Sequence, residues 1–220
     1  MQANTLISSS IKSIHPVEDG NRALEMMDLF RIHHLAVVKN NFYLGVVSDK
    51  EIMNWPSEDD SIEEHLNNLA APHIKCNQHL FDIIEVLEKN NLSVVPVLDE
   101  NKRYLGVITS RKLMYSIAKS AAIQSAGGVI VLEMSNNDYS LTEIASIIES
   151  NNTKILSSYI ISKPNSTNIE VTVKLNKQDV APIIKDFERR EYNVSASYKN
   201  EELDGDFSER YELLMRFLNP

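Results

Sequence analysis

The feature that most constrains the fold of this 220-residue chain is an internal repeat. Residues 33–48, HHLAVVKNNFYLGVVS, and residues 92–109, LSVVPVLDENKRYLGVIT, each have the pattern of two apolar strands around a polar turn. The first strands correspond at an offset of 60 residues and the second strands at 61, because one residue is inserted in the second turn. Two related units of this kind are expected to cover each other's bare sheet face.

Amphipathic helices are predicted ahead of each copy and again after it. The stripe at i, i+3, i+4 and i+7 that indicates the leading helices is formed by Ala23, Met26, Met27 and Phe30 and by Leu80, Ile83, Ile84 and Leu87. Each unit is therefore expected to run strand, helix, strand, turn, strand, helix, with the first at residues 1–60 and the second at 61–120. An unrelated pair of hairpins in another α/β domain is the alternative.

The repeated segments resemble the sequence motif of a known family. The segment SVVPVLDENKRYLGVIT, residues 93–109, resembles the CBS (cystathionine β-synthase-type) motif, and the two copies together resemble a Bateman module. The first copy has Ala36 and Lys39 where the motif has proline and aspartate. The resemblance covers residues 5–120 and implies two halves related by an approximate twofold axis.

The resemblance implies an adenosine nucleotide, such as AMP, ADP, ATP or S-adenosylmethionine, in a cleft between the copies. Apolar strand residues, here Val37 and Pro96, would then lie against the adenine. The residues at the Ser/Thr position of the motif, Ser48 and Thr109, would bond the ligand. The alternative is that both hydroxyls only cap the helices that follow them.

Three residues after that hydroxyl, the family has an aspartate that holds the ribose. This chain has Glu51 in the first copy and Lys112 in the second. A carboxylate accepts from two ribose hydroxyls, whereas a lysine ammonium has no acceptor and would meet a phosphate instead. We therefore expect the cleft with Glu51 to be the better nucleotide site, and the other to be reshaped or empty.

The second half of the chain changes pattern after a linker at residues 121–128. A strand, a helix that begins after Ser140, two strands, a helix containing Pro182 and a closing strand predict the order βαββαβ over residues 129–200. That order is the ferredoxin-like plan, so the chain is expected to be α/β (α+β) overall. After a CBS pair, it resembles an ACT domain, a fold that binds amino acids, and the whole resembles the acetoin-utilisation-type CBS–ACT regulators.

In ACT domains a ligand loop, D-x-P-G-x-L, follows the first strand, and residues 136–141 of this chain read NNDYSL. Asn137, Asp138 and Ser140 are the candidate ligand residues, because a helix N-terminus offers backbone N–H groups to an anion. A plain capping turn is the alternative. Residues 201–220 predict an amphipathic helix that docks on its own domain or on a partner subunit.

Composition argues against several classes of function. The net charge is −9, with acidic residues in excess in both halves, so neither half has the basic surface that nucleic-acid binding requires. No apolar run reaches membrane-spanning length and no secretory signal is visible, so we expect a cytoplasmic protein without membrane insertion. The only cysteine, Cys76, and the spacing of the six histidines predict no metal site, and no catalytic motif is present.

These observations predict a non-enzymatic regulatory protein that requires no cofactor and senses a small ligand. Homodimerisation and a regulated protein partner are expected from the resemblance. Two alternatives stay open: a ligand-free structural or interaction module, and a regulatory subunit of an enzyme or transporter on another chain.

Overall fold

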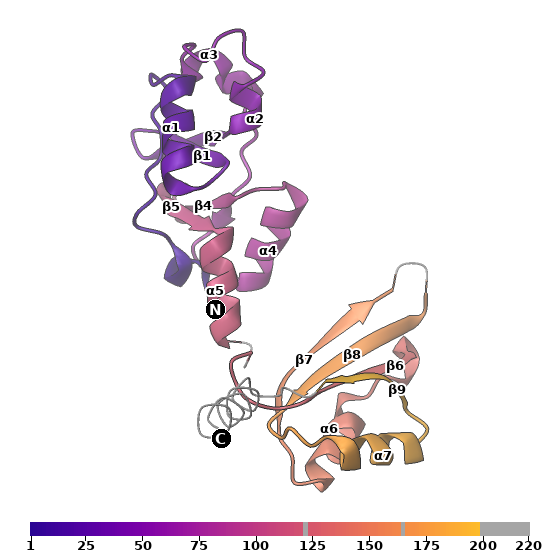
Figure 1. Ribbon diagram of the computed structural model, residues 1–220. Coiled ribbons are helices and arrows are strands. Elements are labelled where there is room, and N and C mark those ends of the chain that lie inside the picture. Colours follow the sequence, from indigo (N-terminus) through magenta and orange to yellow (C-terminus); the bar gives the residue numbers. More distant parts are fainter. Residues whose placement is uncertain (121–122, 164–165, 199–220) are drawn as a thin grey trace, which may run out of the picture. The chain divides into compact units, whose positions relative to one another are not determined.

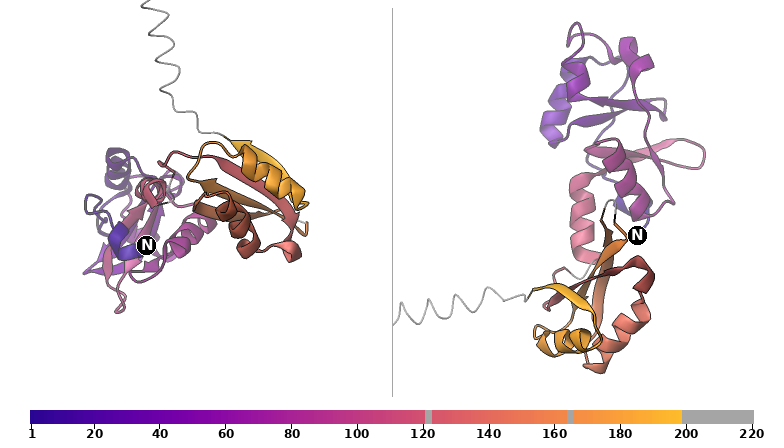
Figure 2. Two further views of the ribbon diagram at one scale, coloured as in Figure 1. Left: turned by 90° about the horizontal axis from the view of Figure 1, so that it is seen from below. Right: turned by 90° about the vertical axis from the view of Figure 1, so that its right-hand side faces the viewer.

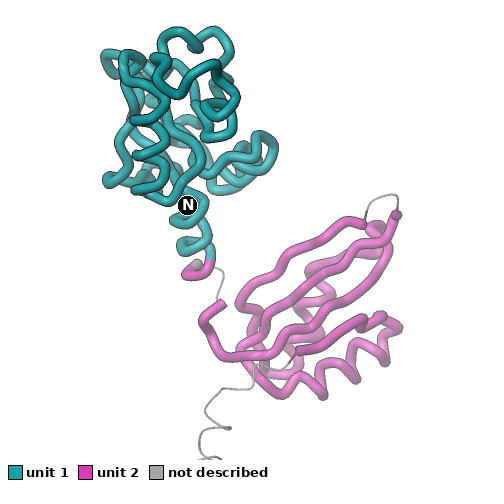
Figure 3. The backbone as a smooth tube through the Cα atoms, turned by 45° about the horizontal axis from the view of Figure 1, so that its top comes forward, with its two compact units in different colours: residues 1–117 teal, residues 118–220 magenta. Residues whose placement is uncertain are grey.

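The computed structural model describes residues 1–120, 123–163 and 166–198. It divides into two compact units, residues 1–117 and residues 118–220 (Figure 3). Two clusters of buried apolar residues form the core of the first unit, and one forms the core of the second. The predicted C-terminal helix at residues 201–220 lies outside the described residues. None of the helices in the described part of the chain combines the length and the apolar character that crossing a bilayer requires.

The first unit is built from two hairpins, each preceded and followed by a helix (Figure 1). The first repeat contains η1 (Ala3–Leu6), α1 (Gly20–Phe30), β1 (His34–Lys39), β2 (Phe42–Ser48), α2 (Asp49–Ile52), α3 (Ile62–His65) and η2 (Leu66–Asn68). The second contains β3 (Ile74–Lys75), α4 (Leu80–Lys89), β4 (Val94–Leu98), β5 (Tyr104–Thr109) and α5 (Ser110–Ser120). The predicted leading strands are short: β3 has two residues, and in the first repeat a single parallel bridge joins Ile14 to Val37.

The register of the two hairpins confirms the repeat and its offsets. In β1–β2 the outermost pair is His34 with Ser48, and in β4–β5 it is Val94 with Thr109, which are 60 and 61 residues further on. The pairing shifts register at the equivalent position of both hairpins, between Val37 and Val38 and between Val97 and Leu98, so that one residue of the second strand is skipped. Each hairpin therefore bends at the same place, as a bulge requires.

The two repeats also share a core. The cluster of buried residues around α1 and β1 takes in Val94 and Val107 of the second hairpin. The N-terminal residues precede the first repeat in sequence but pack on the second, because Ala3 and Leu6 are buried in the core of the second repeat. The chain therefore begins on the second repeat and crosses to the first between residues 7 and 14, where the bridge from Ile14 forms.

Gly106 allows this crossing. The backbone N–H of Ser8 donates to the Val107 carbonyl at 2.8 Å, so the N-terminal segment passes directly over β5. Gly106 has φ +144, and a Cβ there would lie 2.6 Å from Cγ2 of Ile7. Only glycine combines this backbone conformation with such a close approach.

The second unit is an antiparallel four-stranded sheet with two helices on one face (Figure 1, Figure 2). Its elements are β6 (Val129–Ser135), η3 (Asn136–Asp138), α6 (Leu141–Ser150), β7 (Ile155–Ser162), β8 (Asn168–Leu175), α7 (Ala181–Arg189) and β9 (Asn193–Tyr198). The strand order β7-β8-β6-β9 confirms the ferredoxin-like βαββαβ plan. Alternate residues of β8 supply the core, and Pro182 lies in the first turn of α7, where its missing N–H costs nothing.

Candidate functional site

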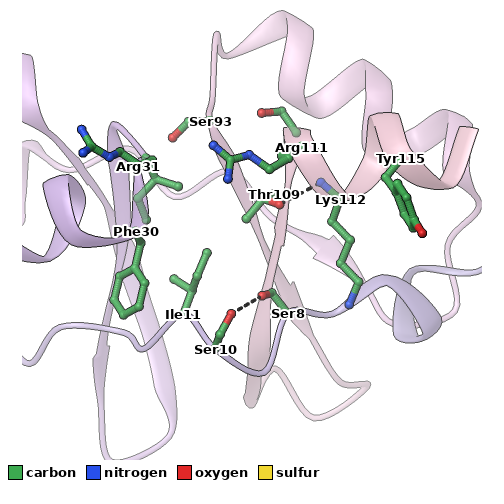
Figure 4. Close-up of a pocket in the computed structure, with 12 residues that line it drawn as sticks. Ser8, Ser10, Ile11, Phe30, Arg31, Ser93, Thr109, Arg111, Lys112 and Tyr115 are labelled. Carbon is green, nitrogen blue, oxygen red and sulfur yellow. Dashed lines mark hydrogen bonds between the residues drawn. The ribbon is translucent and has the colours of Figure 1, made fainter. Parts of the chain in front are cut away.

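A cavity of about 400 Å³, which we call the α5 cleft, lies where the two repeats meet (Figure 4). The segment that follows α1, the start of α5, Ser93 and the N-terminal crossing segment line it. Because these segments come from both repeats, the cleft exists only when the repeats are packed together. Its size is within the range of small-molecule sites in proteins.

The start of α5 is held by two hydrogen bonds at the wall of this cleft. The Thr109 hydroxyl accepts from the backbone N–H of Lys112 at 3.0 Å, and the N–H of Ser110 donates to the Ser93 carbonyl at 3.1 Å. Thr109 is therefore an N-cap, as the capping alternative predicts. Its hydroxyl retains its own proton, which could still be donated to a ligand.

The charged side chains that line the α5 cleft are all cationic. Arg111, Lys112 and Arg31 line it, and no carboxylate is among its lining residues. The Lys112 ammonium donates to the carbonyl of Ile7 at 2.6 Å and so fastens the N-terminal segment to α5. Arg31 forms an exposed ion pair with Asp28 at 3.3 Å, and its guanidinium points away from Arg111 (Figure 4). Exposed pairs of this kind contribute little and exchange readily.

The remaining wall of the α5 cleft is apolar and aromatic. Ile11 of the N-terminal segment lies beside Phe30, and Tyr115 extends from α5 at the other end (Figure 4). The hydroxyls of Ser8 and Ser10 are 3.1 Å apart at the base. An anionic ligand with a flat ring suits this combination, because its ring would contact apolar side chains while its charge faces the cations.

A second cavity of about 430 Å³, the α2 cleft, is related to the first by the internal repeat. It is lined by residues around the start of β1, around the start of α2 and after α4. Six lining positions correspond at offsets of 60 or 61: Arg31 with Asn91, Ile32 with Leu92, His33 with Ser93, Ser48 with Thr109, Asp49 with Ser110, and Lys50 with Arg111. The approximate twofold relation therefore extends to the clefts.

The chemistry of the α2 cleft is different, because it contains a carboxylate. Nδ1 of His33 lies 2.6 Å from Oδ2 of Asp49. Burial alone would raise the pKa of Asp49, but the hydrogen bonds from His33 and from the backbone N–H of Lys50 outweigh it and hold that pKa below its ordinary value. Across residues 1–120, 123–163 and 166–198, no cluster of three or more acidic, histidine or cysteine side chains could hold a metal ion.

Ser93 and His34 join the repeats between the two clefts. The backbone N–H of Ser93 donates to Nδ1 of His34 at 3.2 Å, and the Ser93 hydroxyl lies 3.1 Å from the same nitrogen. That hydroxyl also accepts from the N–H of His33 at 2.9 Å. Burial lowers the pKa of His34, which favours the neutral ring that accepts from Ser93.

The predicted nucleotide residues of the first copy are engaged in local structure. The Glu51 carboxylate accepts from the backbone N–H and the hydroxyl of Ser48, both at 2.7 Å, and the Ser48 hydroxyl accepts from the N–H of Glu51. This is a complete capping box. Ser48 lines the α2 cleft, whereas Glu51 is not among its lining residues. Val37 and Pro96 are buried within their strands.

The candidate residues of the second unit lie at the turn between β6 and α6. Asn137 and Asp138 belong to η3, and the N–H of Asn137 donates to the hydroxyl of Ser135 at 3.3 Å. The hydroxyl of Ser140 accepts from the N–H of Glu143 at 3.3 Å, so Ser140 is the N-cap of α6. These contacts are those of a capping turn, and a ligand at this turn stays a prediction.

Most residues of the α5 cleft were not predicted from the sequence as site residues, among them Arg31, Ser93 and Arg111. Arg31 ends α1 in the left-handed conformation with φ 56, and Asn91, its equivalent after α4, has φ 49. The repeat offsets could have pointed to these residues, because they make Arg31 equivalent to Asn91 and Arg111 equivalent to Lys50. What the sequence does not reveal is that the end of α1 lies beside the start of α5.

Comparisons with known proteins bear on the first unit. The family model of the CBS domain matches residues 3–58 and 70–119. A CBS domain pair/ACT domain protein from Thermotoga maritima is 14% identical, with 54% of this chain and 98% of that chain covered and a TM-score of 0.48. CBSX2, solved in complex with AMP, is 16% identical, with 54% and 96% covered and a TM-score of 0.44. A CBS domain protein of unknown function from Thermoplasma acidophilum is 21% identical, with 52% and 68% covered and a TM-score of 0.43. The first unit of this chain is a tandem pair of CBS domains.

Proposed function

We propose that this protein is a non-enzymatic regulatory module that binds an adenosine nucleotide in the α5 cleft. CBS domains are typically regulatory rather than catalytic, and the domain pair supports a role of this kind. The observation that carries the proposal is the cavity itself: a space of about 400 Å³ between the repeats, with two cations from α5 on one side and Phe30 on the other. AMP, ADP, ATP and S-adenosylmethionine are the candidate ligands.

The α5 cleft is favoured over the α2 cleft as the nucleotide site because Asp49 lines the α2 cleft and no acidic residue lines the α5 cleft. The expectation that Glu51 would hold a ribose requires a carboxylate with free lone pairs facing the α2 cleft. The Glu51 carboxylate instead accepts two hydrogen bonds from Ser48, both on Oε2, and Glu51 is not among the residues that line the α2 cleft. The capping box at Ser48 and Glu51 supports a structural role for the α2 cleft, and a ligand-free structural module is therefore the second candidate function for the chain.

Ligand binding would act by shifting populations of conformations. A nucleotide that contacts Thr109 and Arg111 on one repeat and the end of α1 on the other favours whichever packing of the repeats it fits best. A ligand with equal affinity for every packing would change nothing. The signal would leave through α5 and residues 114–128 toward the second unit, whose ferredoxin-like fold and turn at residues 137–140 support an ACT-like role. A homodimer and a regulated partner belong to the same proposal.

Isothermal titration of the full chain with AMP, ADP, ATP and S-adenosylmethionine tests this function. Ser10→Trp would fill the α5 cleft with an indole, and Lys50→Trp would add the same group at the α2 cleft as a matched control. We expect Ser10→Trp to abolish nucleotide binding and Lys50→Trp to preserve it. Loss of binding in the Lys50→Trp variant alone would move the site to the α2 cleft, and no binding at millimolar ligand would favour the structural module.

A further inference from the structure

Resting on the proposed function, we propose that the α5 cleft recognises a nucleotide through its phosphates rather than through its ribose. Affinity is then highest for the triphosphate and lowest for the nucleoside. Removal of the 2′-hydroxyl has little effect. Three features of the described residues support this selectivity.

The first feature is the charge of the lining, compared between the two related clefts. Along the first turn of α2 the sequence is Asp49, Lys50, Glu51, and the equivalent positions of α5 are Ser110, Arg111 and Lys112. Two acidic residues are thus replaced by a hydroxyl and a cation. The α5 cleft has no lining carboxylate, which is the group best suited to accept from both hydroxyls of a ribose.

The second feature is the position of Lys112. Its ammonium is fixed by one short hydrogen bond, 2.6 Å to the carbonyl of Ile7. An ammonium has three N–H groups, so two are left for a phosphate oxygen. Its stem is partly buried and held at both ends, since its backbone N–H is bonded to Thr109. The ammonium is therefore held beside the N-terminal segment that lines the cleft before any ligand binds.

The third feature is that Arg111 and Lys112 lie in the first turn of helix α5. Helix α5 is 11 residues long and starts at Ser110, so its N-terminus carries the positive end of a helix dipole into the cleft lined by Arg111 and Lys112. The other polar groups are hydroxyls, including the Ser8 and Ser10 pair. Charge-assisted hydrogen bonds to phosphate are roughly twice as strong as the neutral bonds that these hydroxyls could make to a ribose.

The test is a titration series with adenosine, AMP, ADP, ATP and 2′-deoxy-ATP at one ionic strength and without Mg²⁺, which would neutralise the phosphates. We expect ATP to bind about tenfold more tightly than AMP, and 2′-deoxy-ATP to bind within about threefold of ATP. AMP binding as tightly as ATP, or a tenfold loss with 2′-deoxy-ATP, would overturn this inference while leaving the proposed function intact. No binding of any member of the series would overturn the proposed function itself.

Charge variants assign the selectivity to the cleft. Arg111→Gln is expected to weaken ATP binding about tenfold and AMP binding by less than about threefold, because fewer phosphate charges are then affected. Lys50→Gln, at the equivalent position of the α2 cleft, is the matched control and should leave both affinities unchanged. An equal loss of ATP and AMP affinity in Arg111→Gln would contradict recognition by phosphate number. Urea unfolding followed by Trp55 fluorescence shows whether each variant is folded.

Discussion

Two equivalent tyrosines provide a sharp test of the packing between the repeats. Tyr43 and Tyr104 occupy the same position in their hairpins, opposite Val38 and Leu98. The Tyr43 hydroxyl donates to the carbonyl of Pro72 at 2.8 Å, whereas the buried Tyr104 hydroxyl has no hydrogen-bond partner among the described residues. Burial raises the pKa of Tyr104 to about 12. Burial also raises the pKa of Tyr43, and the charge of the neighbouring Tyr104 raises it further.

Replacing each tyrosine by phenylalanine should therefore have opposite effects. Tyr43→Phe removes a hydrogen bond and should lower the free energy of unfolding by about 1 kcal/mol. Tyr104→Phe removes a buried polar group that makes no bond and should raise the free energy of unfolding by about 1 kcal/mol. The two variants should thus differ by about 2 kcal/mol, even though the same atom is deleted from equivalent positions.

Urea unfolding followed by fluorescence is the suitable assay. The chain has a single tryptophan, Trp55, which lies in the first unit and stacks on His65 with ring centroids 3.9 Å apart. Its signal reports the first unit without interference from the second. If Tyr104→Phe is destabilised as much as Tyr43→Phe, the Tyr104 hydroxyl has a partner and the described packing around it is wrong.

Three further predictions concern other parts of the molecule. Gly127 has φ +150 and a Cβ there would lie 1.8 Å from the Leu175 carbonyl oxygen, so Gly127→Ala should destabilise the second unit by more than about 2 kcal/mol. Circular dichroism should show that loss, while the Trp55 transition stays unchanged. The pKa of His34 is lowered by burial from 6.5, so its contribution to stability is complete above pH 6.5 and is lost as the pH falls through the lowered value. His34→Gln should therefore flatten the dependence of the urea midpoint between pH 7.5 and pH 5, and an unchanged slope would count against the Ser93 contact. Lys163 lowers the pKa of Glu133 through an ion pair of 2.9 Å on the exposed side of the sheet, so Lys163→Gln should raise that pKa in a carboxyl NMR titration.

The sequence predicts much of the fold because its signals are local or repeated. The two hairpins follow from alternating apolar segments, and the 60 and 61 offsets identify equivalent residues that the structure pairs with the same register. In the second unit, Ile169, Val171, Val173 and Leu175 alternate along β8 and are all buried, so the face of that strand was predictable.

The details of the clefts could not be predicted, because they depend on contacts between distant residues. Lys112 bonds to Ile7, 105 positions away in the sequence. The N-terminal segment carries no periodic pattern, yet it crosses from the second repeat to the first and lines the α5 cleft. Glu51 has the chemistry to hold a ribose, but Oε2 of its carboxylate accepts two hydrogen bonds from Ser48 at the N-terminus of its own helix, and Glu51 does not line the α2 cleft.

Hydrogen exchange measured by mass spectrometry, with and without saturating ATP, tests the central claim most directly. If a nucleotide binds between the two CBS domains in the α5 cleft, exchange should slow in residues 8–11, 30–32 and 109–115. The equivalent start of α2, residues 48–51, should be unaffected. Protection confined to residues 48–51 or to the second unit, or no protection at all in the presence of bound ATP, would contradict the proposed site.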